Sequence, residues 1–201
     1  MSEQSLGLEE QQGSVVDIVE PNRPGHFLLS RLQNTKADPQ LIESGAEIET
    51  RRNRLAEMYG NIETIGEDFL RRFSETYAEH GFPIRGELRF YVVGGRLTDK
   101  PLRYDSDIDC AITVEGGEDF RPLYGEEPDE LIKRKRQARD EFANTALSEL
   151  AEKYQFQLTE EIPSGEVVKG SLFEPKEYGT ADSVFRAKGL PAVLVARYRA
   201  A

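Results

Sequence analysis

The amino-acid sequence predicts an α/β (α+β) domain in which helices and strands follow one another along the chain. Two segments, about residues 64–81 and 128–154, repeat their apolar residues at helical spacing. Between them, residues 87–93 and 108–114 are rich in β-branched and aromatic side chains, and each is followed by a glycine pair. At 201 residues the chain is long enough for one well-packed core and short for two independent ones.

The first 38 residues differ in composition from the rest of the chain. They are rich in Gln, Glu, Ser, Gly and Pro, and their main apolar residues are Val15-Val16 and Phe27-Leu28-Leu29. This is little apolar surface to offset the entropy lost when a long segment becomes ordered. The sequence therefore predicts a flexible lead over residues 1–38, with room for one docked stretch, and a single domain over residues 39–201.

Two helices are expected before the first strand. Between residues 39 and 59 the apolar residues recur loosely at helical spacing. The next helix is better defined, because Thr64 with Glu67 three positions later resembles a capping box. Its apolar side chains gather on one face, and we expect it to end near Gly81. These residues are Ile65, Phe69, Leu70, Phe73 and Tyr77.

The second half of the chain begins with a long helix and continues into shorter elements. Pro128 and Asp129 open the helix, which extends to about residue 154. Its predicted buried stripe consists of Leu131, Ala138, Phe142, Ala146, Leu147 and Leu150. Residues 155–162 are expected to form a third strand, and residues 167–173 to contain a short one. The apolar run at residues 192–195 is too short to classify by its periodicity.

The charge balance bears on the class of partner. Lys and Arg number 26 against 37 Asp and Glu, which gives a net charge of −11 and opposes tight binding to a polyanion. One dense basic run, Lys133, Arg134, Lys135, Arg136 and Arg139, lies within the long helix. These residues wrap around much of the helix, which favours a solvated face. The alternative is a patch beside a cleft that steers a nucleic-acid acceptor.

The sequence also predicts a protein of a reducing, cytoplasmic compartment. Cys110 is the single cysteine and has no partner for an internal disulfide. The two histidines, His26 and His80, are far apart, so no structural zinc site is expected. No run of about 18 apolar residues and no secretory signal pattern is found, so no membrane association is expected.

The chemistry is expected in residues 90–114, which read FYVVGGRLTDKPLRYDSDIDCAITV. A strand runs directly into Gly94 and Gly95, which lack a Cβ atom and so let backbone amides approach the phosphate oxygens of a ligand. By itself such a pair is also typical of an ordinary turn.

Asp107-Ile108-Asp109 enters the following strand. Side chains alternate along a strand, so both carboxylates leave one face, with their Cα atoms about 6–7 Å apart. They are then close enough to share Mg²⁺ ions about 3.5–4 Å apart. The alternatives are a solvated strand start and a turn capped by Asp105 and Ser106. An EF-hand loop is excluded, because Cys110 stands where that loop needs glycine and Gly116 where it needs glutamate.

Together, the strand, the glycine pair and Ser-Asp-Ile-Asp on the next strand resemble the nucleotidyltransferase superfamily that includes DNA polymerase β. The Val-Gly-Gly-Arg start is similar to the head domain of CCA-adding enzymes and bacterial poly(A) polymerases. This resemblance covers about 25 of the 201 residues. It implies a small mixed β-sheet backed by helices, with two Mg²⁺ ions held by Asp107 and Asp109. It also implies that NTP phosphates lie against Gly94, Gly95, Arg96 and Ser106.

Other features of the superfamily are matched less well. A third carboxylate is common on a later strand, and the candidates here are Glu160 and Glu161. Glu161 is preferred, because alternation places it opposite the core if Phe156, Leu158 and Ile162 face inward. Thr98 precedes Asp99 where the CCA-type pattern has an Arg-Asp pair, and no neck or body domain follows. For Arg96 and Arg103, the alternative that they are simply solvated loop residues stays open.

The resemblance implies a Mg²⁺-dependent nucleotidyltransferase that binds an NTP such as ATP. It would transfer a nucleoside monophosphate to a hydroxyl of an RNA end, a small molecule or a protein, with release of pyrophosphate. The alternative is a catalytically inactive nucleotidyltransferase-like module with a binding or regulatory role. A metal-dependent glycosyltransferase is disfavoured, because no doubly wound βαβ pattern precedes the acidic pair.

Overall fold

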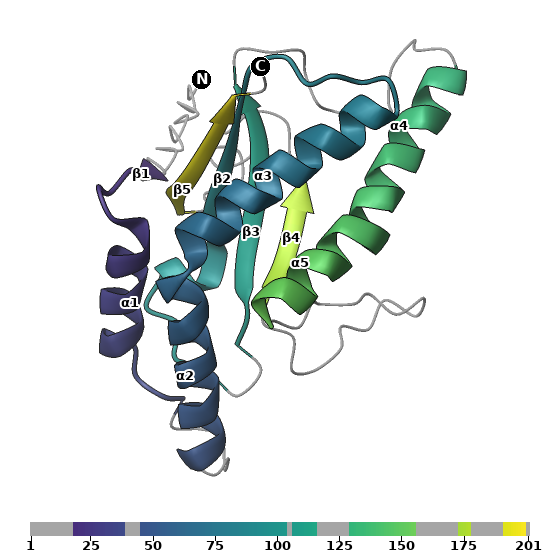
Figure 1. Ribbon diagram of the computed structural model, residues 1–201. Helices are drawn as coiled ribbons and strands as arrows, with labels where there is room; N and C mark the ends of the chain where they lie inside the picture. Colours follow the sequence, from purple (N-terminus) through teal and green to yellow (C-terminus); the bar gives the residue numbers. More distant parts are fainter. Residues whose placement is uncertain are drawn as a thin grey trace, which may run out of the picture.

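The computed structural model describes residues 18–38, 45–103, 106–115, 129–155, 173–177 and 191–199. They build a mixed sheet in the order β1-β5-β2-β3-β4 (Figure 1). The strands are β1 Ile18–Val19, β2 Glu87–Val93, β3 Ile108–Glu115, β4 Phe173–Glu177 and β5 Ala192–Arg199. Strand β2 is antiparallel to β3 and β5, whereas β4 is parallel to β3 and the two-residue β1 is parallel to β5.

Helices cover one face of this sheet, so the predicted mixed sheet backed by helices is confirmed as an architecture. The first three are α1 Pro24–Asn34, α2 Gly45–Gly60 and α3 Ile62–Glu79. A fourth, continuous helix consists of α4 Asp129–Glu141, the π-helical turn η2 Phe142–Ala146 and α5 Leu147–Tyr154. In Figure 1, α3 and the fourth helix lie across the sheet, and α2 extends away from the end where β3 begins. No helix in the described ranges is long and apolar enough to cross a bilayer.

The main core fills the space between the sheet and the helices. Phe142 packs edge-on against two rings of α3, with centroid distances of 5.9 Å to Phe69 and 5.0 Å to Phe73. Gly66 brings α3 close to the sheet, because a Cβ atom there would lie 2.9 Å from Cδ1 of Phe90. The five residues predicted for the buried face of this helix are all buried. A smaller apolar cluster, centred on Tyr91, Val93 and Leu194, lies apart from the main one.

The described part of the lead, residues 18–38, is docked on the rest of the domain. Leu28 and Leu32 of α1 are 1% and 4% exposed and belong to the main core, and β1 pairs with β5. The apolar triplet at residues 27–29 therefore marks an integral helix. Residues 1–17 lie outside the described ranges.

Two element boundaries differ from those expected from the sequence. Helix α3 begins at Ile62 with Asn61 at its N-cap position, so Thr64 lies within the helix and does not cap it. The cause is Ile62, which is fully buried and adds a residue to the apolar face. Gln155 has a left-handed backbone, with φ of 54°, and ends α5 instead of starting a strand. The remainder of the strand expected at residues 155–162 lies outside the described ranges, as does the side chain of Leu131.

Candidate active site

The candidate site begins where β2 ends at Val93 and the chain turns into the short 3₁₀ helix η1, Gly94–Leu97. Gly94 has φ of +77°, a conformation that glycine adopts without strain. A Cβ atom at this position would lie only 2.7 Å from Oδ2 of Asp109. Val93 is also the register partner of Asp109 across the antiparallel pair. The glycine therefore lets the backbone turn directly against the carboxylate.

Asp109 lies on the sheet face opposite the main core. Ile108, Cys110 and Ile112 of β3 are buried in that core, on the side of the helices, and Asp109 alternates with them. Asp107 directly precedes β3, and both aspartates are half-buried. That both carboxylates share one face stays a prediction for Asp107.

The backbone amides of Gly94 and Gly95 have different surroundings. The N–H of Gly94 donates to the carbonyl oxygen of Pro191, which precedes β5, at 3.2 Å. The amide of Gly95 is the next one along η1, and it precedes the first i→i+3 hydrogen bond of this 3₁₀ helix, in which the Arg96 amide pairs with the carbonyl of Val93. Of the two glycines, it is Gly95 whose amide is placed to face a ligand.

Two cationic side chains accompany this turn. Lys100 crosses Gly95, with its Nζ 4.0 Å from the position a Cβ atom would occupy. Arg96 donates from Nη2 to the carbonyl oxygen of Pro101 at 3.3 Å, and the hydroxyl of Thr98 donates to the carbonyl oxygen of Gly95 at 2.8 Å. These bonds fold the loop over η1. Sequence reasoning missed Lys100, because its place beside Gly95 depends on this loop closure.

Ser106 has a structural contact of its own. Its buried hydroxyl oxygen accepts the N–H of Arg103 at 2.9 Å, and its own N–H donates to the carbonyl oxygen of Arg103 at 3.2 Å. Ser106 thus closes the turn that leads into β3. This agrees with the alternative interpretation of Ser106 as a residue that caps a turn. Arg103 is exposed, and residues 104 and 105 lie outside the described ranges.

Tyr59, near the end of α2, adds a buried phenol to the site. Burial raises its pKa well above the ordinary tyrosine value; Arg96 acts in the opposite direction, while Cys110, Asp107 and Asp109 add to the rise. The hydroxyl therefore keeps its proton at neutral pH. No local sequence pattern pointed to this residue.

The resemblance also implies a third carboxylate that completes the metal site. Glu160 and Glu161 lie outside the described ranges, so the preference for Glu161 stays a prediction. Strand β4 places Glu174 in register with Asp109 on the neighbouring parallel strand. Among the side chains that are described, no three of His, Cys, Asp or Glu gather as a metal site. The sequence had indicated a short strand ending at Phe173 but not its register.

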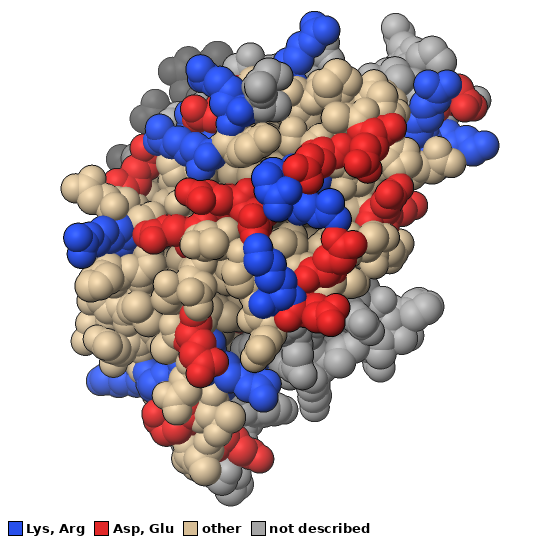
Figure 2. All heavy atoms as spheres, in the orientation of Figure 1, with Lys and Arg blue, Asp and Glu red and all other residues tan. Residues whose placement is uncertain are grey.

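The basic run of the long helix is separate from this turn. Lys133, Arg134, Arg136 and Arg139 are exposed, as the solvated-face interpretation predicted. Figure 2 shows acidic and basic side chains interleaved on the face of the molecule that carries the helices. Comparison of the chain with models of protein families, with curated proteins and with solved structures finds no match.

Proposed function

We propose that this chain is a Mg²⁺-dependent nucleotidyltransferase with a nucleotidyltransferase-like fold. It moves a nucleoside monophosphate from an NTP to an acceptor hydroxyl. The observation that carries the proposal is the contact between the Gly94 backbone and the Asp109 carboxylate. A turn that needs glycine at Gly94, and leaves the Gly95 amide outside the hydrogen bonds of η1, lies beside Asp109 of the acidic pair. This arrangement suits a ligand that brings phosphates and a divalent cation together.

The described residues fit a divalent cation. Asp107 and Asp109 offer hard oxygen ligands, and Gly94 places no side chain between the acidic pair and the turn. When bound there, Mg²⁺ would lower the pKa of the acceptor hydroxyl and offset the charge of the triphosphate.

The other residues act by position and charge. The Gly95 amide, with the side chains of Arg96 and Lys100, orients the phosphate oxygens. The acceptor oxygen attacks the α-phosphorus and forms a new P–O bond. The bond from the α-phosphorus to the bridging oxygen breaks, pyrophosphate leaves with that electron pair, and the hydroxyl proton passes to solvent.

The direct test measures pyrophosphate release and transfer of labelled nucleotide from each of the four NTPs, with Mg²⁺ and a cell extract as acceptor pool. Asp109→Asn is expected to lower the rate at least about 100-fold, because it removes a charged ligand without changing the shape of the side chain. Asp140→Asn, at an exposed position of α4, is the matched control and should keep the rate.

Two outcomes would contradict the proposal. Equal rates for Asp109→Asn and Asp140→Asn would exclude the acidic pair from the chemistry. Absence of transfer from every NTP, together with absence of Mg²⁺-dependent NTP binding in calorimetry, would leave a non-catalytic module.

A further inference from the structure

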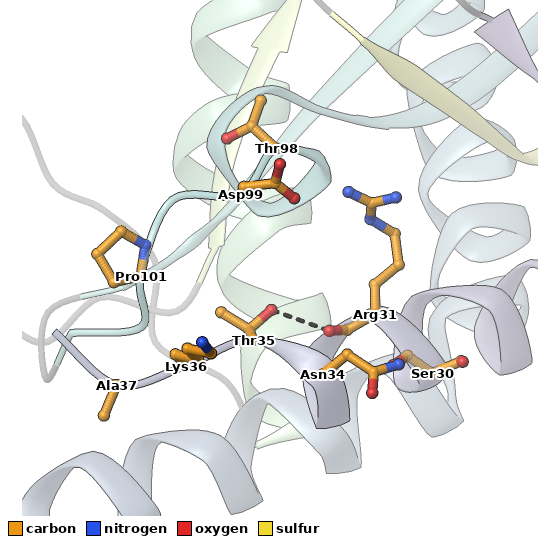
Figure 3. A pocket seen from close by; sticks show the side chains of 9 residues that line it. All are labelled: Ser30, Arg31, Asn34, Thr35, Lys36, Ala37, Thr98, Asp99 and Pro101. Atoms are coloured by element: carbon orange, nitrogen blue, oxygen red, sulfur yellow. Dashed lines mark hydrogen bonds between the residues drawn. The ribbon is translucent and has the colours of Figure 1, made fainter.

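A cavity of about 680 Å³ adjoins the candidate active site (Figure 3). The C-terminal end of α1 forms one wall, residues 35–37 form the floor, and the loop at residues 98–101 faces them. Ligand pockets for small molecules have about this size, roughly 300–1,000 Å³. Thr98 belongs both to the cavity and to the loop folded over η1, so the cavity and the Gly95 amide share one short stretch of chain.

The walls of this cavity are held by hydrogen bonds that do not depend on a ligand. Arg52 of α2 donates to the carbonyl oxygen of Leu32 at 2.7 Å and to that of Thr35 at 3.0 Å, which fixes the end of α1. The N–H of Leu102 donates to the carbonyl oxygen of Lys36 at 2.7 Å and ties the floor to the facing loop. A ligand therefore meets walls already in place, which lowers the entropy cost of binding.

The cations of the cavity favour an anionic group. Arg31 donates from Nη2 to the carbonyl oxygen of Leu97 at 2.7 Å, which holds its guanidinium on the side of the facing loop (Figure 3). Lys36 supplies a second, exposed positive charge. A phosphate monoester carries a charge of about −1.5 to −2 near pH 7 and suits two cations better than a single carboxylate does.

Two further polar side chains of the cavity, Thr35 and Asp99, favour a ligand with hydroxyl groups. Thr35 donates its hydroxyl hydrogen to the carbonyl oxygen of Arg31 at 2.9 Å, which leaves its oxygen as an acceptor. Asp99 is exposed at the opposite wall, and an ionised carboxylate only accepts hydrogen bonds. A ligand with several hydroxyl donors satisfies both residues.

We propose that this cavity binds a small phosphorylated sugar, with the phosphate at Arg31 and Lys36 and the sugar hydroxyls at Asp99 and Thr35. Resting on the proposed nucleotidyltransferase function, this sugar phosphate is the acceptor. The net charge of −11 supports a small acceptor over a long polyanion. The short connection between the cavity and the Gly95 turn places the acceptor beside the nucleotide.

Calorimetry with ribose 5-phosphate, without NTP or metal, tests the binding site. Lys36→Gln is expected to weaken binding about tenfold, since it removes one charge-assisted contact. Lys133→Gln, at an exposed position of α4, is the control and should leave binding unchanged. Ribose and inorganic phosphate should each bind at least about tenfold more weakly than the sugar phosphate, because each satisfies one half of the cavity.

The proposal is overturned if Lys100→Gln weakens the binding of ribose 5-phosphate while Lys36→Gln does not, because the probe then lies on the Gly95 turn. It is also overturned if inorganic phosphate or an amino acid such as glycine binds as tightly as the sugar phosphate. The same titration in the Asp107→Asn/Asp109→Asn protein separates the two proposals. Binding that persists there with its Lys36 dependence supports the cavity even if no NTP is ever turned over.

The acceptor role has its own readout. With ribose 5-phosphate and an NTP as substrates, Lys36→Gln should raise the KM for the sugar phosphate about tenfold and leave the KM for the NTP unchanged. Equal KM values for the sugar phosphate in the wild-type protein and the variant would remove the cavity from the reaction.

Discussion

At the scale of single residues, the site depends on Gly94, a position that has no room for a side chain. Gly94 combines a left-handed backbone with a carboxylate oxygen 2.7 Å from where its Cβ atom would be. Side chains rarely adopt this backbone conformation, and the oxygen belongs to one of the two aspartates proposed to hold the metal. The stability of the fold and the proposed activity are therefore both expected to depend on this glycine.

Gly94→Ala is expected to destabilise the protein by about 1–2 kcal/mol, the cost of a left-handed alanine, before any cost of displacing Asp109. Nucleotide transfer should fall more than about tenfold, because the carboxylate has to move. Gly60→Ala is the matched control, since a Cβ atom there meets no other atom within 4 Å. Chemical denaturation and the transfer assay measure the two effects. Transfer by Gly94→Ala at the wild-type rate would rule out a functional role for the Gly94–Asp109 contact.

At the scale of elements, α3 and α5 are joined by charged pairs above the aromatic core. Asp68 of α3 accepts hydrogen bonds from Tyr154 at 2.5 Å, from Arg71 at 3.3 Å and from Lys153. Burial acts to raise the pKa of Asp68, but these hydrogen bonds outweigh it and hold the pKa below the ordinary value of 3.8. Arg72 and Glu149 form a second pair between the same helices.

The lowered pKa of Asp68 predicts a dependence of stability on pH. A carboxyl group with a depressed pKa in the folded state stabilises the protein above its unfolded value of 3.8, and this stabilisation is lost as pH falls through the folded pKa. Asp68→Asn should therefore cost about 1 kcal/mol near pH 7 and much less near pH 2. Urea unfolding at several pH values measures the difference. Asp140→Asn, whose partner Arg139 is its neighbour on the exposed face of α4, should show little effect at either pH.

Local patterns predicted much of the element structure, for reasons visible in particular residues. Phe69 and Phe73 recur at helical spacing, and both strands that carry the site motif are marked by β-branched residues and glycine pairs. The rest depends on pairing between distant segments. The run at residues 192–195 lies within β5, but only its pairing with both β1 and β2 makes it an internal strand. Glu174 likewise gains its place from register alone, as Lys100 does from a folded loop.

At the scale of the whole molecule, the described acidic side chains of the face that carries the helices lie among basic ones and not in one acidic patch. Over the face in Figure 2, positive and negative side chains alternate. The cations with a proposed role, Arg96, Lys100, Arg31 and Lys36, belong to the turn or to the adjoining cavity. Local charge, and not the overall field, is therefore expected to bring anionic substrates to the site.

This distribution predicts that the basic run of α4 has no part in transfer. The triple variant Lys133→Gln/Arg134→Gln/Arg136→Gln should keep the transfer rate within about twofold at both about 50 mM and about 200 mM NaCl. Steady-state transfer assays at the two salt concentrations measure this. A rate that falls steeply with salt in the wild-type protein, but not in the triple variant, would instead assign the run to a polyanionic acceptor.

The central place of β5 has a consequence for how the protein reaches its native state. This strand lies between β1 and β2, yet the chain reaches it only after β2, β3, the long helix and β4. Until then, one edge of β2 keeps its backbone groups unpaired, and such edges are prone to join other chains. Pairing between segments this far apart also slows folding, because the intervening loop must be closed first. Aggregation during synthesis should therefore depend on how soon β5 fills its place, and weakening β5 should lower the yield of soluble protein before it lowers the activity of the molecules that fold.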